Sequence, residues 1–440
     1  MSISESAVSA NMVGKIDLAF GLNGVAAIDI PGAATQPVAV INGPDDKLYV
    51  CGTATFQNES KFFIAALSAN GEIVPEFGSM GYAIGVFQEA EHSFANALEL
   101  KDNKLLLVGS SYIGTDPYPA MAQFDLMGNL DTTFGQNGQG KIVHFIPGPA
   151  IDSSKQELSR PFKSVSQNPS IQKQSSMGLA DGKTLLTHYF FRFGSPSYGV
   201  LIRTLANGSL DIDFNSRGYL EVIAPGYENG QTQIESVTVD SDGRYVVCGG
   251  ISDLGFSPVK TFFARFSSDG AADPTFGPGG FRVIADPDDL PGGVRADALM
   301  SLANGGILGL GRSVHDPYVS QLLQLQASGE LDTDFNDGNP LNMRLAESST
   351  LWQTFTRQAD SKLVVAGAID KQKNSFVFDI VVARFDRTGK LDLTFNEPLG
   401  WARTRLSTRN DGAYSVVLQR DKIVVTGVSS NKGVVVRYHG

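Results

Sequence analysis

The stretch GNLDTTFG at residues 128–135 recurs along the chain in closely similar form. It returns as GELDTDFN at 329–336 and as GKLDLTFN at 389–396. The shared pattern is Gly, two residues, usually Asp, two residues, Phe, and then Gly or Asn. We call it the plug phrase, and its copies place the phenylalanine at Phe20, Phe77, Phe134, Phe214, Phe276, Phe335 and Phe395. A period of roughly 60 residues is typical of repeat architectures, so the phrase marks seven units.

The residue after each phenylalanine is always Gly or Asn, for example Gly135 and Asn336. These residue types adopt a left-handed backbone at the lowest cost. We therefore predict that the phrase forms a backbone turn closed by a buried phenylalanine. This interpretation gives the phrase a structural role and no chemistry of its own.

Between the phenylalanines, each unit contains short alternating apolar and polar runs. Residues 38–53 and 96–111 each read as two strands joined by an Asp/Asn/Gly turn, which favours a tight hairpin. A third run follows each pair, as at 62–67 and 120–124, and a fourth follows each phenylalanine, as at 140–146. Helical periodicity is nearly absent. Each unit is therefore expected to form four short antiparallel strands.

Seven such units predict a single closed seven-bladed β-propeller with four antiparallel strands per blade. The chain opens on a plug phrase and a fourth strand at 24–30, and it closes on a third strand at 434–438. The closing blade is therefore expected to be shared by the N- and C-termini. We predict a flexible N-terminal segment at 1–13, the propeller at 14–440, and an insertion loop at 147–176.

The plug phrase, together with an Asp-Gly-Lys hairpin, resembles the delta-60 repeat family of bacterial propeller-like proteins. The resemblance covers about residues 14–440, and it implies the fold far more than an activity. The second unit departs from the pattern, because GEIVPEFG at 71–78 has Val74 where Asp is usual.

This departure predicts a contact inside the other units. The third strand of the second unit has Ala66, whereas the corresponding residue elsewhere is Arg or Gln. Because the unit without the donor is also the unit without the carboxylate, we infer a donor–carboxylate contact, which arginine suits well. A ring of ligand-binding arginines is the alternative. The predicted pairs are Gln123–Asp131, Arg203–Asp211, Arg265–Asp273, Gln324–Asp332, Arg384–Asp392 and Arg437–Asp17.

The charge balance limits the possible partners. The chain has 46 acidic and 35 basic residues, a net charge of −11. Nucleic acid and anionic membrane surfaces need a basic footprint, so neither is expected as a partner. No run of about 18 apolar residues occurs, so no membrane insertion is expected. The first residues lack a basic segment followed by an apolar one, so we expect a protein that is cytoplasmic or exported without a Sec signal peptide. We also expect a monomer.

The loops between second and third strands, and those leading into the next unit, differ from unit to unit. We call the side that carries them the variable face, and binding is expected there because it presents diverse loops on a rigid frame. Aromatic residues recur in these loops and predict contacts with a protein, peptide or glycan. Alternatively, they only cover strand ends, and 147–176 is either a lid or a tolerated loop. The candidate binding residues are Tyr118, Tyr198, Phe256, Tyr318, Trp352 and Tyr227.

The sequence contains few signatures of catalysis. The five histidines fall in separate units, and no nucleophile elbow, phosphate-binding loop or dinucleotide fingerprint is found. We therefore predict no catalytic residue, cofactor or metal, with Asp286, Asp288 and Asp289 as weak candidates for a cation site. The favoured function is a non-catalytic binding or scaffold propeller. The alternatives are a polysaccharide hydrolase or lyase using these aspartates as acid and base, or the targeting part of a toxin-like or surface protein.

Overall fold

The structure is a computed structural model that describes residues 12–114, 116–135, 138–147, 176–190, 195–254, 258–372 and 377–440. Most of the N-terminal segment predicted at 1–13 lies outside the described residues. The insertion predicted at 147–176 does too, except for its two end residues.

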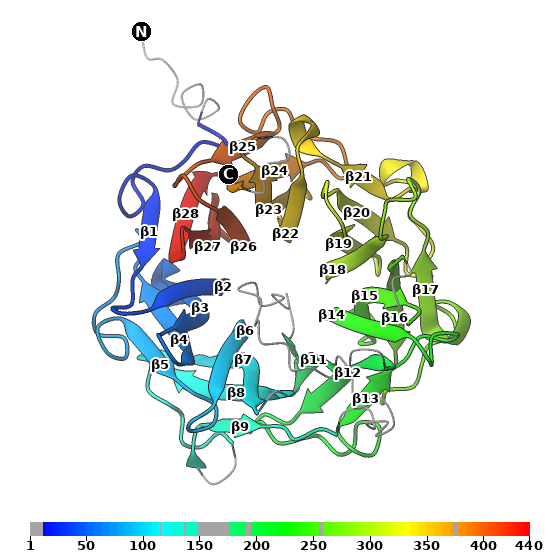
Figure 1. Ribbon diagram of the computed structural model, residues 1–440, viewed down its shortest axis with the longest axis horizontal. Helices are drawn as coiled ribbons and strands as arrows, with labels where there is room; N and C mark the ends of the chain where they lie inside the picture. Colours follow the sequence, from blue (N-terminus) through cyan, green and yellow to red (C-terminus); the bar gives the residue numbers. More distant parts are fainter. Residues whose placement is uncertain are drawn as a thin grey trace.

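The chain is an all-β propeller whose sheets are arranged radially around a central axis (Figure 1). Every unit runs from the axis outward, so the first strand is innermost and the fourth is outermost. The first strands are β2 (Ala34–Asn42), β6 (His92–Lys101), β10 (Ser176–Gly178), β14 (Gln231–Val239), β18 (Val294–Ser301), β22 (Thr350–Arg357) and β26 (Asp411–Gln419). The second strands are β3 (Leu48–Thr55), β7 (Lys104–Ile113), β11 (Thr184–Phe190), β15 (Tyr245–Ser252), β19 (Ile307–Ser313), β23 (Leu363–Asp370) and β27 (Lys422–Ser429).

The outer half of each unit contains a third strand and a shorter fourth strand. The third strands are β4 (Ser60–Leu67), β8 (Asp116–Asp125), β12 (Ser197–Thr204), β16 (Lys260–Phe266), β20 (Ser320–Leu325), β24 (Phe378–Phe385) and β28 (Lys432–His439). The fourth strands are β1 (Val25–Ile28), β5 (Tyr82–Gly85), β9 (Lys141–Val143), β13 (Tyr219–Val222), β17 (Phe281–Ile284), β21 (Leu341–Met343) and β25 (Trp401–Thr404). Short 3-10 turns are η1 (Pro44–Asp46), η4 (Pro278–Gly280), η5 (Asn336–Gly338) and η6 (Leu345–Glu347).

The prediction of a closed propeller with seven separate four-stranded blades is wrong. The described strands form five separate four-stranded blades, namely β1-β28-β27-β26, β2–β5, β6–β9, β18–β21 and β22–β25. Strands β10 to β17 instead form one eight-stranded sheet. They are joined by a parallel pairing of β12 with β14, in which Ser197 and Tyr198 lie opposite Gln231 and Thr232.

A glycine explains how β12 and β14 come together. Gly199 follows the paired residues, and a Cβ at this position would lie 2.5 Å from Cγ1 of Ile234 on β14. The missing side chain therefore leaves room for the neighbouring strand. The backbone N–H of Ser197 also donates to the carbonyl oxygen of Gly230 at 3.1 Å. This junction depends on two units together, which a search for features repeated within single units does not detect.

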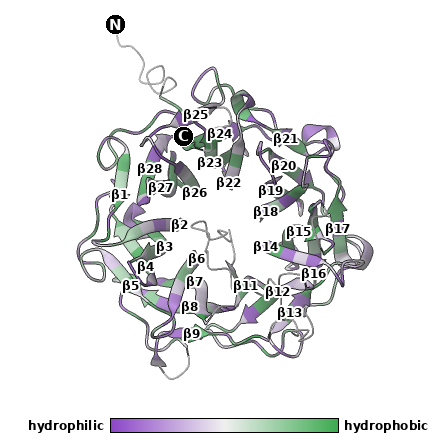
Figure 2. Ribbon diagram, in the orientation of Figure 1, coloured by the Kyte–Doolittle hydropathy of each residue, from purple (hydrophilic) through white to green (hydrophobic). Residues whose placement is uncertain are grey.

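The hydrophobic core lies between neighbouring sheets. The second and third strands contribute runs of Val, Leu, Ile and Phe that are buried on both faces, such as LYVCGTAT in β3. Hydrophobic residues therefore recur in the strands around the whole ring (Figure 2). The two ends of the chain share one blade, since Val25–Ile28 of β1 pair antiparallel with Gly433–Val436 of β28.

The plug phrases form the predicted turns. All seven phenylalanines are buried, with at most 3% of the side chain exposed. The next residue is left-handed in six copies, including Asn215, Asn336 and Asn396 with φ between 46° and 48°. The exception is Gly277, whose φ of 162° is extended. The structural interpretation of the phrase is confirmed.

Each plug turn also contacts the next unit. At six of the seven junctions the first glycine of the following phrase lies against the phenylalanine ring, and a Cβ added to Gly208 would be 2.5 Å from Cζ of Phe134. Across the same junction, the N–H of Gly135 donates to the carbonyl oxygen of Asn207 at 2.9 Å. The N–H of Asn396 donates to Val13 O at 3.0 Å, which joins the last plug turn to the first.

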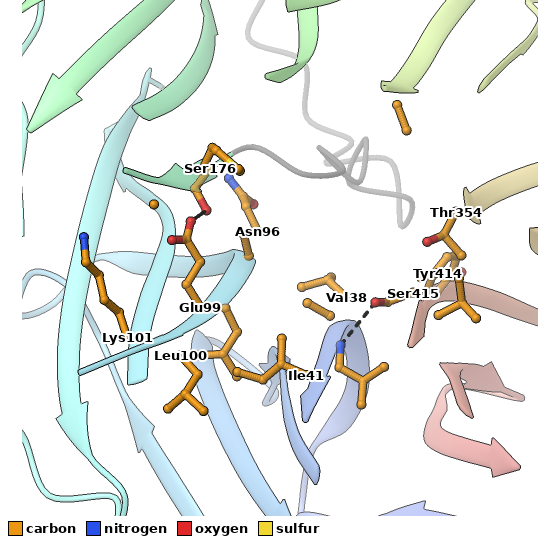
Figure 3. Close-up of a pocket in the computed structure, with 18 of the residues that line it drawn as sticks. Val38, Ile41, Asn96, Glu99, Leu100, Lys101, Ser176, Thr354, Tyr414 and Ser415 are labelled. Atoms are coloured by element: carbon orange, nitrogen blue, oxygen red, sulfur yellow. Dashed lines mark hydrogen bonds between the residues drawn. The ribbon is translucent and has the colours of Figure 1, made fainter. Parts of the chain in front are cut away.

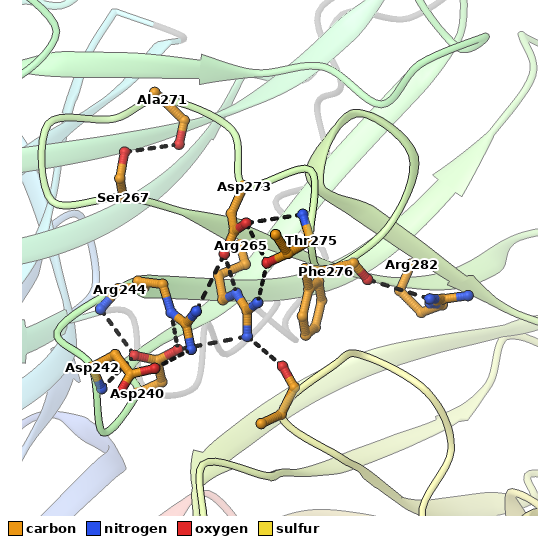
Figure 4. Close-up of polar contacts among 11 residues, drawn as sticks. Asp240, Asp242, Arg244, Arg265, Ser267, Ala271, Asp273, Thr275, Phe276 and Arg282 are labelled. Carbon is orange, nitrogen blue, oxygen red and sulfur yellow. Dashed lines mark hydrogen bonds and ion pairs between the residues drawn. The ribbon is translucent and has the colours of Figure 1, made fainter.

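The predicted donor–carboxylate contact is confirmed in the arginine units. In one of them, Arg265 Nε donates to Asp273 Oδ2 at 2.8 Å, and Nη1 donates to Ala327 O in the next unit at 2.6 Å (Figure 4). The guanidinium carbon also lies 4.6 Å from the ring centroid of Phe276, within cation–π range. We call this arrangement the guanidinium clasp. The corresponding Nε–Oδ2 contacts are Arg203–Asp211 at 2.6 Å, Arg384–Asp392 at 2.8 Å and Arg437–Asp17 at 2.8 Å.

Replacement of Asn336 tests the left-handed turn. We expect Asn336→Val to lower the free energy of unfolding by about 1–2 kcal/mol, because a β-branched residue is strained at positive φ. Asn336→Gly removes the side chain without that strain and should cost less than Asn336→Val. Urea denaturation of both variants checks this, and equal losses would contradict the backbone explanation.

Candidate functional site

The innermost strands surround a pocket of about 570 Å³ on the central axis (Figure 3). Its described lining comes from β2, β6, β10, β18, β22 and β26 and the residues next to them. The size is within the range typical of small-molecule sites, about 300–1,000 Å³. This pocket is therefore a candidate binding site in the described part of the chain.

A β-bulge recurs on the inner strands and changes the direction of one side chain on each. Six of the inner strands shift register against their second strand at one residue. Four of these bulged residues, Val38, Asn96, Gln353 and Tyr414, line the pocket. The other two, Glu235 and Asp297, form ion pairs with Arg295. The nitrogen–oxygen distances are 3.5 Å to Glu235 and 3.0 Å to Asp297. Bulges often re-aim side chains beside functional sites, so variation at this position can change what the pocket presents.

Glu99 supplies the carboxylate in the described lining of the pocket. It lies on β6 and accepts a hydrogen bond from the hydroxyl of Ser176 on β10 (Figure 3). Nearby, Lys101 Nζ donates to Leu179 O at 2.9 Å, so β6 is held to the next unit at two points. Burial raises the pKa of Glu99, and the Ser176 hydrogen bond and the charge of Lys101 only partly offset this.

This raised pKa gives a pH-dependent stability. The folded state binds the proton of Glu99 more tightly than the unfolded state, so its contribution is present below the unfolded value and is lost as pH rises through the folded pKa. We therefore expect Glu99→Gln, which stays neutral, to gain stability relative to the parent protein as pH is raised from about 4 to 8. Melting temperatures measured at several pH values check this. A difference in Tm that does not change with pH would contradict it.

The rest of the pocket lining is mostly apolar or neutral. Ile41, Leu100 and Phe355 provide apolar surface, and Thr354 and Tyr414 provide hydroxyl groups (Figure 3 labels four of these). Burial raises the pKa of Tyr414 to about 12, so its hydroxyl remains a neutral donor at physiological pH. Such a lining can hold an amphipathic ligand by apolar contact and a few hydrogen bonds. It contains no carboxylate pair of the kind that glycoside hydrolysis uses, among the residues described.

On the variable face, Tyr118 and Phe145 form an aromatic pair. Tyr118 lies on β8 and is half-buried, and its ring centroid is 5.2 Å from that of Phe145. Phe145 follows β9 and is 64% exposed. Phe145 is not among the residues predicted from the sequence, although the alternation of buried His144 and Ile146 around it indicates that it faces outward.

The other predicted aromatic residues are not brought together into one rim. Tyr198, Tyr227 and Tyr318 are half-buried and belong to different parts of the ring. Lys260 Nζ donates to the Tyr227 hydroxyl at 3.1 Å. Trp352 is fully buried and packs against Phe385 at 6.4 Å between centroids, so it is a core residue and not the rim residue that we expected. Phe256 lies outside the described residues.

Two of the three aspartates that are weak candidates for a cation site accept hydrogen bonds from amide groups. Asn342 Nδ2 donates to Asp286 Oδ1 at 2.8 Å and to Asp288 Oδ2 at 2.9 Å, while Asp289 is exposed. Asp286 also accepts a hydrogen bond from the N–H of Leu290 at 2.7 Å. Within the described ranges, no group of three or more His, Cys, Asp or Glu is placed to hold a metal ion. The described part of the chain likewise has no helix long and apolar enough to cross a membrane.

Comparisons with known proteins agree with the propeller architecture. Residues 100–134, 241–276 and 358–395 match a family described as a domain of unknown function (DUF5122) beta-propeller. The chain is a β-propeller repeat protein. No curated protein matches it.

Similar solved structures share about a tenth of their residues with this chain. A protein of unknown function from Dyadobacter fermentans is 11% identical, with a TM-score of 0.46 over 95% of this chain and 100% of that chain. The polysaccharide lyase Uly1 is 10% identical, with a TM-score of 0.46 over 100% and 95%. Virginiamycin B lyase from Staphylococcus aureus is 9% identical, with a TM-score of 0.42 over 93% and 98%.

Proposed function

We propose that this chain is a non-catalytic binding module that contacts a protein, peptide or glycan through its variable face. The observation that carries the proposal is the aromatic pair of half-buried Tyr118 and exposed Phe145, held at the edge of a rigid sheet. Large aromatic side chains on a rigid support are the usual anchors of binding energy. We also assign the repeats to the delta-60 type, on the strength of the plug phrase.

The central pocket supports binding rather than turnover. Glu99 is the carboxylate of its described lining, and it is already hydrogen-bonded by Ser176. General acid–base catalysis on a glycan normally uses two carboxyl groups about 5–10 Å apart. The pocket is better suited to hold an apolar or hydroxyl-bearing group by contact than to act on it.

A glycan array and a cell-lysate pull-down test this function. We expect Tyr118→Ala to weaken binding by about 30-fold, the loss typical of an anchor residue, while Tm stays within about 2 °C of the parent. Met80→Ala is a matched control, because Met80 is 80% exposed but follows a plug phenylalanine on the opposite face. A partner footprint that hydrogen exchange maps to the plug turns would overturn the assignment.

A polysaccharide hydrolase or lyase is the second candidate, favoured by one observation. The raised pKa of Glu99 is the property that a general acid needs near neutral pH. Assays of uronate-containing and neutral polysaccharides with the parent protein and Glu99→Gln test it. Turnover that Glu99→Gln abolishes would establish the enzyme and overturn the binding module.

A further inference from the structure

One plug-phrase aspartate lacks the cation that its counterparts have. Asp332 accepts a hydrogen bond from Gln324 Nε2 at 2.5 Å, because Gln324 stands where other units have arginine. Among the described residues, no Lys, Arg or His forms an ion pair with it. The other plug aspartates are paired as Asp17 with Arg437, Asp131 with Lys104, Asp211 with Arg203 and Lys183, Asp273 with Arg265 and Arg244, and Asp392 with Arg384 and Lys362.

A second difference removes the other cation from the same place. In several units a Lys or Arg at the beginning of the second strand also contacts the plug aspartate, as Lys362 contacts Asp392 at 3.2 Å. Lys362 directly precedes Leu363, the first residue of β23. The equivalent residue of the Asp332 unit is Gly306, which directly precedes β19. The substitutions Gln324 and Gly306 therefore leave the carboxylate of Asp332 without a cation of its own.

A pocket of about 360 Å³ lies at this position, between the blade β18–β21 and the blade β22–β25. Gln324, Asp332 and Phe335 line it, as does Arg387 of the next unit. These are the four positions that form the guanidinium clasp elsewhere. Arg387 stands two residues before Gly389, just as the clasp acceptor Ala327 stands two residues before Gly329.

The clasp units show which chemical group these positions bind. In the unit of Arg265, the guanidinium donates to the carboxylate of Asp273 at 2.8 Å and to the carbonyl oxygen of Ala327 at 2.6 Å. Its carbon atom lies 4.6 Å from the centroid of the Phe276 ring. The Asp332 unit retains the carboxylate, the next-unit backbone and the buried Phe335, but it lacks the guanidinium. A planar guanidinium can use all three contacts at once, whereas an ammonium is a compact point charge.

We propose that this pocket binds a guanidinium group supplied by a ligand, either a small guanidinium compound or an arginine side chain of a partner. The remaining charged groups of the lining are Asp334, Asp386, Arg357 and Arg387. With Asp332 they give three carboxylates against two guanidinium groups, so the lining favours a cation. The site lies among the plug turns, on the side of the propeller opposite the variable face. The proposal is therefore independent of the binding proposed for the variable face.

Titration calorimetry with agmatine, L-lysine methyl ester and L-citrulline tests the proposal. We expect agmatine to bind, citrulline (which has the shape of arginine but no charge) not to bind, and the lysine ester to bind at least about tenfold more weakly than agmatine. Gln324→Arg should abolish agmatine binding and raise Tm, because the new side chain would restore the clasp. Asp332→Asn should weaken agmatine binding at least about tenfold, and it keeps the test valid if Gln324→Arg fails to fold.

Asp213→Asn is the matched control. Asp213 is an exposed plug-turn aspartate in the unit where Arg203 already fills the clasp, so its replacement should leave agmatine binding unchanged. A pentapeptide with a central arginine distinguishes the two sources: tighter binding than agmatine identifies a protein partner, and equal or weaker binding identifies a small molecule. Absence of agmatine binding, equal binding of citrulline, or retained binding in a folded Gln324→Arg variant would each overturn the proposal.

Discussion

Deletion of residues 1–31 is expected to abolish cooperative folding. It removes β1 from the blade that the two chain ends share, and it exposes the backbone edge of β28. It also removes Phe20, which is fully buried, and Asp17, which accepts from Arg437 Nε at 2.8 Å. Arg437 would then be a largely buried cation without its carboxylate, a loss that typically costs about 3–5 kcal/mol by itself.

Thermal unfolding followed by circular dichroism measures this effect. A shorter deletion of residues 1–11 is the control, because it removes none of the contacts described above. We expect that control to melt like the full chain. If the longer deletion also melted with an unchanged midpoint, the N-terminal strand and plug turn would be dispensable, and the importance of the shared blade would be refuted.

Replacement of a plug phenylalanine is expected to have the second-largest effect. Phe134 is 2% exposed and supports Gly208 of the next unit, so Phe134→Ala should leave a cavity at a junction between units. The expected loss is about 3–5 kcal/mol, the usual cost of truncating a buried phenylalanine. The urea midpoint should fall accordingly.

Phe145→Ala is the matched control for Phe134→Ala. Both changes remove the same atoms, but Phe145 is 64% exposed and follows a short outer strand. Its replacement should cost no more than about 1 kcal/mol. Similar losses for the two variants would show that the plug phenylalanines are not the special feature of these turns.

Features that depend only on residues of one unit could be predicted from the sequence. The left-handed residue after the phenylalanine follows from the choice of Gly or Asn, and the clasp follows from the joint loss of arginine and aspartate at Ala66 and Val74. Both signals are local and repeated. The one deviation, Gly277, could not be anticipated, since glycine permits extended and left-handed backbone equally.

Features that depend on contacts between two units, or on how deeply a side chain is buried, could not be predicted in the same way. The pairing of Ser197 with Gln231 merges two predicted blades, and it arises from the approach of neighbouring strands. Trp352 stands at the beginning of an inner strand where the alternating pattern allows either face, and the structure places it in the core. Glu99 and the pocket beside Asp332 did leave a signal, namely a charged residue in an apolar strand and a missing donor in a repeat. The second signal is Gln324, which stands where four other units have Arg.

The contact between each phenylalanine and the glycine of the following unit also bears on how such a chain can lengthen or shorten during evolution. Gly208 fits against Phe134 in the same way as Gly71 fits against Phe20, so these junctions within the chain are alike. Duplication or loss of one complete unit preserves a matched glycine and phenylalanine at every junction. Gain or loss of part of a unit would leave one phenylalanine without its glycine, or the reverse. Genes for such proteins should therefore change size in steps of one whole repeat.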